Sequence, residues 1–374
     1  MKYFQITCIL TIIAFLLFSC NKAKQGDLWE IPVDIDQNTS IPLSEIAEEI
    51  TAIELELTNE SMINPNQILR IFIIEEEVIV ITWTKILVFN KGGKFIRSIG
   101  SLGQGPGEYI NISGAAIDLK NKRLFVLSYP NFLIYDINGK FLKHCKSSEL
   151  LSRLTLKNDL NFINDNLFII GDMYTPGYRE KGKDVAISSI VYQLDNDFHI
   201  SDSCLIRTII LENLCSSTTS LIGYILNGSK NIYVYYGDFY ISEKRGNLGD
   251  RQLCDTLYRF ENNCLVPELK LKYKNNSKAK STYLLNIYRS SRYIFAYYFK
   301  GDPLKDHYFC YDTKTNKGYN AQDGYSDDIN KLKEPVRIRP LSTNTEMFYY
   351  LHTNMKPDDR EEPNPTLYIG RLKK

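Results

Sequence analysis

The stretch RIFIIEEEVIVITWTKILVFNKGGKFIRS, residues 70–98, decides the fold because it recurs further along the chain. Residues 116–144, AIDLKNKRLFVLSYPNFLIYDINGKFLKH, align with it without a gap. In both copies, apolar runs alternate with turn residues in a way that indicates four short strands. A repeat of roughly 40 to 50 residues with four strands is typical of a β-propeller blade. The sequence therefore predicts an all-β propeller with its first two blades at 68–100 and 112–145.

Four further blades are expected after these two, although their sequences diverge from the repeat. Strand-like runs occur at 167–170, 190–194 and 198–200, at 231–236, 255–260 and 265–273, at 293–298 and 307–312, and at 346–351 and 366–372. The sixth blade stops after its third strand, which leaves an open edge that a propeller has to cover. Residues 50–57, ITAIELEL, alternate apolar and acidic side chains as a half-buried strand does. We expect this segment, preceded by a brief helix at 44–49, to close a ring of six four-stranded blades.

The N-terminus carries an export signal. Lys2 precedes an apolar run at 8–18, which is shorter than the about 20 residues that cross a bilayer but fits a signal peptide. Leu17-Phe18-Ser19-Cys20 resembles the lipobox of bacterial lipoproteins, in which the cysteine is lipidated and becomes the first mature residue. We therefore expect a signal peptide at 1–19, lipidated Cys20 with a polar tether at 20–27, and the propeller at 28–374. An ordinary secretory signal with an incidental cysteine is the alternative.

Composition narrows the remaining function classes. The chain has 45 basic and 44 acidic residues, so it lacks the basic surface that nucleic-acid binding requires. The four histidines are scattered without an HExxH motif, and no GxSxG motif occurs. We expect no cofactor, no resident metal and no contact with the membrane beyond the lipid. Residues 21–27 lack the acidic cluster that marks surface export in some lipoproteins, which favours the periplasmic side of the outer membrane.

The loop after the first blade, GSLGQGPGEY at 100–109, is rich in glycine. It lacks the lysine and serine of a P-loop, and Glu108 stands where GxGxxG needs its last glycine, so we interpret it as a tight turn. Its GQGPGEY segment, together with DTLY at 255–258, SRYIFAYY at 291–298, YDTKT at 311–315 and DDIN at 327–330, resembles the six-bladed β-propeller lipoproteins of Bacteroides-type Gram-negative bacteria. The resemblance implies NHL-like blades and an envelope location. It implies no particular substrate.

The connections between second and third strands are long in blades three to six, at 171–185, 237–254, 300–306 and 352–365. In a propeller these connections emerge on the same face as the blade-to-blade loops, and insertions gathered on one face usually mark a binding surface. Loops also lengthen at little energetic cost, which is the alternative explanation. We expect tyrosine to supply flat apolar area and arginine to supply charge-assisted hydrogen bonds there. The candidate ligand-binding residues are Gln104, Glu108, Tyr109, Tyr178, Arg179 and Arg245.

Two functions remain open from the sequence. The first is a non-catalytic, lipid-anchored envelope protein that binds a glycan, a peptide or another envelope protein on this face. The second is a propeller hydrolase or lyase that acts on a sugar or lactone with a metal in the central channel. If that metal is calcium, it requires oxygen ligands. The candidate ligands are Glu108, Asn111, Asn161 and Asn227.

Overall fold

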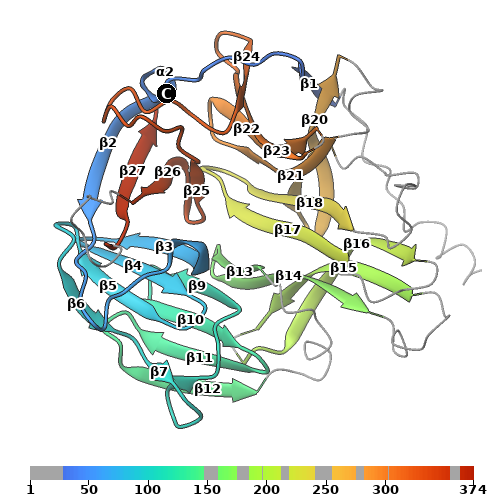
Figure 1. The fold of residues 1–374 in the computed structure, drawn as a ribbon. Coiled ribbons are helices and arrows are strands. Elements are labelled where there is room, and N and C mark those ends of the chain that lie inside the picture. The colour runs from blue at the N-terminus through green and yellow to red at the C-terminus, as the bar shows by residue number, and fades with distance from the viewer. Residues whose placement is uncertain are drawn as a thin grey trace, which may run out of the picture.

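The computed structural model describes residues 28–146, 159–174, 185–195, 197–211, 219–240, 255–274, 282–301, 303–353 and 363–374. The expected signal peptide, Cys20 and the tether thus lie outside the described residues. The described strands form six large sheets that follow one another around a closed ring, as Figure 1 shows. Each sheet contains four antiparallel strands from the centre of the ring to its rim. These strands follow in chain order in blades one to five, whereas blade six takes its outer strand from the N-terminal segment and blade four carries a fifth, parallel strand. The predicted six-bladed, all-β propeller is confirmed.

Blades one and two show that the sequence repeat is a structural repeat. Blade one consists of β3 (Ile68–Ile74), β4 (Glu77–Thr82), β5 (Ile86–Asn90) and β6 (Phe95–Ser98), and blade two of β9 (Gly114–Asp118), β10 (Arg123–Ser128), β11 (Asn131–Asp136) and β12 (Phe141–Lys146). Val80 pairs with Leu87 in blade one, and their repeat equivalents Val126 and Leu133 pair in blade two. The gapless alignment therefore reflects the same strand register in both blades.

Blades three to five follow the same plan with longer strands. They consist of β13 (Asp159–Ile163), β14 (Asn166–Tyr174), β15 (Val185–Leu194) and β16 (Ile200–Leu211); of β17 (Thr219–Asn227), β18 (Ile232–Tyr240), β19 (Thr256–Glu261) and β20 (Cys264–Tyr273); and of β21 (Thr282–Arg289), β22 (Tyr293–Lys300), β23 (Lys305–Asp312) and β24 (Lys317–Gln322). The predicted runs fall on the second to fourth strands of these blades. The innermost strands β13, β17 and β21 were not predicted.

Blade six combines a strand from the N-terminal part of the chain with the C-terminal strands. It consists of β25 (Arg339–Leu341), β26 (Asn344–His352), β27 (Thr366–Leu372) and, as its outer strand, β2 (Ala47–Glu54). β2 pairs antiparallel with β27 from Ala47 opposite Leu372 to Glu54 opposite Thr366, and Figure 1 shows the blue N-terminal strand beside the red C-terminal one. The predicted ring closure is confirmed. The strand begins at 47 rather than at 50, because the helix α2 (Leu43–Ile46) ends before the expected residue 49.

The closing strand contacts blade one as an ordinary fourth strand contacts the next blade. The Glu56 N–H donates a hydrogen bond of 2.9 Å to the carbonyl of Gly93, in the turn between β5 and β6. A Cβ atom at Gly93 would clash with the Glu54 carbonyl, so only glycine fits this approach. The repeat equivalent, Gly139, faces Ile99, which follows the outer strand of blade one. The outer strand of one blade therefore contacts a glycine turn of the next blade in both places. This outer strand is β6 between blades one and two, and β2 between blades six and one.

A strand that the sequence did not reveal extends blade four. β1 (Trp29–Val33) pairs in parallel with β20 as a fifth strand and buries Ile31 and Val33. From there the chain passes along blade five, where the Thr39 N–H donates to the Asn320 carbonyl over 2.6 Å. The N-terminal segment therefore contacts blades four, five and six in succession. The 3-10 helix η1 (Pro65–Gln67) then leads into β3.

The core consists of apolar clusters between neighbouring blades. Ile79 and Ile81 of blade one pack with Val126 and Leu133 of blade two, and Ile53 of the closing strand belongs to the cluster between blades six and one. Both faces of a blade are covered in this way. Among the described residues, none forms a helix that is long and apolar enough to cross a membrane.

Candidate functional site

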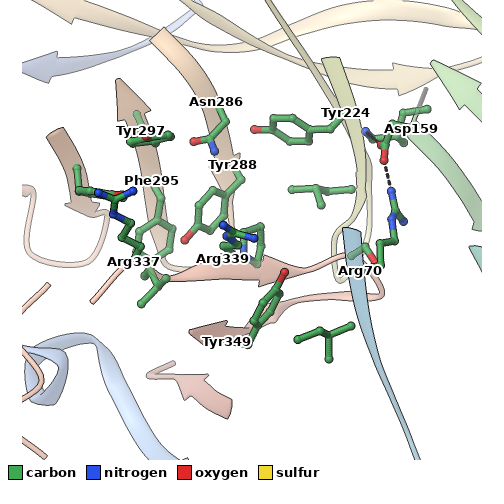
Figure 2. Close-up of a pocket in the computed structure, with 18 of the residues that line it drawn as sticks. Arg70, Asp159, Tyr224, Asn286, Tyr288, Phe295, Tyr297, Arg337, Arg339 and Tyr349 are labelled. Carbon is green, nitrogen blue, oxygen red and sulfur yellow. Dashed lines mark hydrogen bonds and ion pairs between the residues drawn. The ribbon is translucent and has the colours of Figure 1, made fainter. Parts of the chain in front are cut away.

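A cavity of about 340 Å³ lies in the central channel, a volume typical of small-molecule sites of about 300–1,000 Å³. The inner strands β3, β13, β17, β21 and β25 contribute to its wall, together with residues of β22 and β23. Figure 2 shows the lining side chains directed toward one another around this space. The inner strand of blade six has only three residues and includes Pro340, which lacks an N–H and suits a strand edge.

An ion-pair cluster lies on one side of the cavity. Arg70 of β3 pairs with Asp159 of β13, and it also donates to the Asn161 amide oxygen over 3.0 Å. Asp159 accepts a further hydrogen bond of 2.7 Å from the Asn161 amide and another of 2.7 Å from the Ile225 N–H. Because these residues belong to blades one, three and four, the cluster ties three inner strands together.

Aromatic side chains form much of the opposite wall. Tyr288 stacks on Phe295 with ring centroids 4.5 Å apart, and Tyr297 stacks on Tyr308 at 4.9 Å. Burial raises the pKa of Tyr224 and Tyr288 well above the ordinary value. These phenols are therefore neutral at physiological pH, and each keeps a proton to donate. The Tyr224 hydroxyl donates its proton to the Ile287 carbonyl.

Two buried polar atoms in this wall have no hydrogen-bond partner among the described residues. They are the amide oxygen of Asn286 and the hydroxyl of Tyr288, which stand two positions apart on β21 and both line the cavity. Tyr288 is only 4% exposed. Buried polar atoms are nearly always paired in folded proteins, so each unpaired atom requires an explanation. A ligand that hydrogen-bonds to both atoms would satisfy them.

Three arginines line the cavity, and they differ in how their charge is balanced. Arg70 pairs with Asp159, and Arg337 pairs with Asp306, which also accepts a hydrogen bond from the Tyr297 hydroxyl. Arg339 forms no ion pair or hydrogen bond with any described residue, and its side chain is exposed. The described part of the cavity wall therefore carries an excess positive charge at Arg339.

The glycine-rich loop lies away from this cavity. β7 (Ser101–Leu102) pairs in parallel with β8 (Glu108–Tyr109), and the Glu108 carboxylate accepts the Gly105 N–H at 2.7 Å. Tyr109 is 2% exposed and its hydroxyl donates to the Ile99 carbonyl over 3.3 Å, so burial raises its pKa to about 12. Gln104 is exposed. Of the three predicted residues in the loop, Gln104 thus presents its side chain to solvent, Glu108 is half-buried and Tyr109 belongs to the core.

The loop nevertheless lies on the expected face. Gly107 has a φ of +76°, as a tight turn built on glycine requires. The Ile112 N–H donates to the Trp83 carbonyl over 2.8 Å, and the Ile110 N–H donates to the Ser128 hydroxyl over 3.0 Å. Both partners stand where second and third strands of blades one and two are connected. The other predicted contacts, Tyr178, Arg179 and Arg245, fall outside the described residues.

None of the four candidate calcium ligands is among the described residues that line the cavity. Asn161 belongs to the adjoining ion-pair cluster, where both ends of its amide are used by Arg70 and Asp159. Glu108 is engaged with its own loop. Among the residues that the structure describes, no group of three His, Cys, Asp or Glu side chains could share a metal ion.

Sequence reasoning missed the residues that form the cavity. The segment RIRP at 337–340 could have indicated part of the cavity, because arginines two positions apart in an extended segment place two cations on one side of the chain. Asn286 and Tyr288 gave no such signal, since an asparagine and tyrosines within TYLLNIYR are typical of any partly buried strand.

Comparison with known proteins places the chain in a family. A protein of Bacteroides fragilis named as exported has the same fold, with a TM-score of 0.60, 17% identity, and coverage of 92% of this chain and 99% of that one. A Bacteroides caccae protein of unknown function and the WD40 domain of Pan2 from Neurospora crassa match with TM-scores of 0.39 and 0.42, at 12% and 11% identity, covering 76% and 82% of this chain and 86% and 76% of theirs. No curated protein matches in sequence. The family described as a domain of unknown function, DUF4934, matches residues 28–368, and the chain belongs to that family.

Proposed function

We propose that the protein is a non-catalytic, lipid-anchored binding protein of the cell envelope, and that a small polar ligand occupies its channel cavity. The observation that carries the proposal is the pair of buried, unpartnered atoms, the Asn286 amide oxygen and the Tyr288 hydroxyl, in the wall of one cavity. Leaving such groups unsatisfied costs about 1–3 kcal/mol each. A ligand with matching hydrogen-bonding groups would offset that cost and gain affinity from it.

The rim of the propeller would extend the binding surface. Gln104 is exposed in the glycine-rich loop, and large apolar side chains are exposed close by in the chain, with Trp83 at 52%, Leu102 at 54% and Ile110 at 56%. Such a mixture of apolar and polar groups suits contacts with a glycan or a peptide. Together with Tyr178, Arg179 and Arg245, these residues would hold the part of a larger ligand that remains outside the channel.

The membrane attachment rests on the sequence LFSC at 17–20. We expect labelled fatty acid to enter the wild-type protein in its native type of host, and Cys20→Ala to abolish that labelling. The protein should fractionate with the outer membrane and resist protease added to intact cells if it faces the periplasm. Equal labelling of the wild type and Cys20→Ala would show that the cysteine is incidental.

The cavity can be tested by filling it. Ser342, in the turn after β25, lines the cavity, whereas the adjacent Thr343 does not. We expect Ser342→Phe to lower the affinity for a ligand found in a glycan and metabolite screen by at least about tenfold, because the ring would occupy ligand space. Thr343→Phe is the matched control and should bind as the wild type does, as measured by calorimetry.

A different result would redirect the assignment. Equal affinity of Ser342→Phe, Thr343→Phe and the wild type would place the ligand outside the channel. Turnover of the bound compound that stops when calcium is chelated would support the hydrolase or lyase instead.

A further inference from the structure

The charge balance of the cavity indicates which ligand it accepts. Among the described residues, Asp159 is the only carboxylate in its lining, and it already accepts from Arg70, Asn161 and Ile225. A ligand ammonium group would therefore find no free anion there, and it would be repelled by the arginines. An anionic ligand group, in contrast, meets the guanidinium of Arg339, which has no protein partner among the described residues.

The form of the anion follows from the same side chain. One planar guanidinium binds a planar carboxylate through two parallel N–H···O bonds. A phosphate group carries about 1.5 to 2 negative charges at neutral pH, which exceeds the single unbalanced charge at Arg339. The neighbouring tyrosines, being neutral, contribute no charge on either side. The charge balance of the cavity therefore favours a ligand with one carboxylate.

The rest of the ligand has to satisfy the uncharged groups. The Asn286 amide and the Tyr288 hydroxyl require a group that can both donate and accept hydrogen bonds, and an alcohol does both. Two stacked ring pairs line the cavity and supply apolar wall, namely Tyr288 with Phe295 and Tyr297 with Tyr308. The apolar C–H face of a sugar ring fits such a wall, while its hydroxyls reach the polar atoms.

We infer that the cavity binds a sugar acid, with its carboxylate on Arg339 and its ring hydroxyls on Asn286 and Tyr288. The inference rests on the proposed function, since it names the ligand of the same cavity. Arg339 is then the residue that determines the preference for acidic over neutral sugars. Tyr288 and Asn286 contribute to affinity for both kinds of sugar.

The test compares one acidic sugar with two neutral sugars of similar size and shape. Calorimetry would measure binding of glucuronate, its methyl ester and glucose to the wild type, Arg339→Gln, Tyr288→Phe and Arg123→Gln. Arg123 is an exposed arginine of β10 that does not line the cavity, and it serves as the matched control. Folding of each variant is checked by its melting temperature.

We expect the wild type to bind glucuronate about 10- to 100-fold more tightly than the ester or glucose, as a charge-assisted hydrogen-bonded pair implies. Arg339→Gln should lose that preference while it still binds glucose. Tyr288→Phe should weaken the binding of glucuronate and of glucose by a similar factor. Arg123→Gln should bind both sugars as the wild type does. Added salt should weaken only the glucuronate complex of the proteins that retain Arg339.

Two results would overturn the inference, and they are distinguishable from failure of the proposed function. If a neutral sugar binds as tightly as glucuronate and Ser342→Phe blocks it, the cavity is a binding site but the ligand is not an acid. If Arg339→Gln keeps the preference for glucuronate, the carboxylate lies elsewhere. If neither these sugars nor any compound of the wider screen binds in the cavity, both the inference and the proposed function are wrong.

Discussion

A protein that begins at residue 59 should fail to fold cooperatively, whereas one that begins at residue 36 should fold with reduced stability. The first lacks β2, which pairs with β27 over its whole length and supplies the outer strand of blade six. Its loss leaves β27 as an open edge and exposes the partners of Ile53 and Leu55, which are 3% and 5% exposed in the closed ring. We expect a loss comparable to the whole stability of a domain, about 5–15 kcal/mol.

The shorter truncation is the matched control. It removes β1, which is added to blade four after that sheet already has four strands, so the ring stays closed. The cost should be limited to the burial of Ile31, Val33 and Ile35, each of which contributes about 1.5–3 kcal/mol. Circular dichroism melting and urea unfolding, compared with a protein that begins at residue 28, would measure both effects. A protein starting at 59 that melts at the parent temperature would contradict the closure of the ring by β2.

The sequence predicted the outer part of the propeller better than its centre for a physical reason. The middle strands, such as β4 and β10, bury side chains on both faces between blades, so they consist of unbroken apolar runs. Inner strands border the channel, and they carry polar residues such as Asp159, Asn161 and Arg339 that interrupt the pattern. The sequence WEIPV of β1 shows the right alternation, but nothing in it indicates that blade four is its partner.

The sequence predicted which residue types would form the candidate site, but it did not predict which residues of those types come together. Arginine and tyrosine were expected as ligand-binding residue types, and the described lining of the cavity contains Arg339 and Tyr288, neither of which was singled out from the sequence. Which arginine remains unbalanced depends on which carboxylate lies opposite, and Asp306 of another blade takes Arg337. Such pairings between blades are long-range contacts that one sequence does not contain. The same holds for Tyr109, whose position in the core depends on its packing at Ile99 and Tyr135.

Removing the Asp159 carboxylate should be the most damaging single side-chain change in the channel. Asp159→Ala leaves the Arg70 guanidinium, which is 13% exposed, without its anion, and it leaves the Ile225 N–H without its acceptor. Breaking one partner of a buried pair costs about 3–5 kcal/mol. Arg70→Met should cost less, because the carboxylate then keeps the Asn161 amide and the Ile225 N–H as donors. Urea unfolding midpoints would measure both variants.

The double variant Arg70→Gln/Asp159→Asn separates charge from shape. It replaces the ion pair by two neutral amides that can still bridge blades one and three, and it should recover most of the stability lost in Asp159→Ala. Ordinary surface substitutions change the free energy of unfolding by no more than about 0.5 kcal/mol. If Asp159→Ala changes it by as little, the cluster does not hold the inner strands together. Ligand binding gives an independent readout, because the charge that the further inference assigns to the ligand lies at Arg339 and not at Arg70. A folded double variant should therefore still prefer glucuronate to glucose, since both substitutions leave Arg339 unchanged.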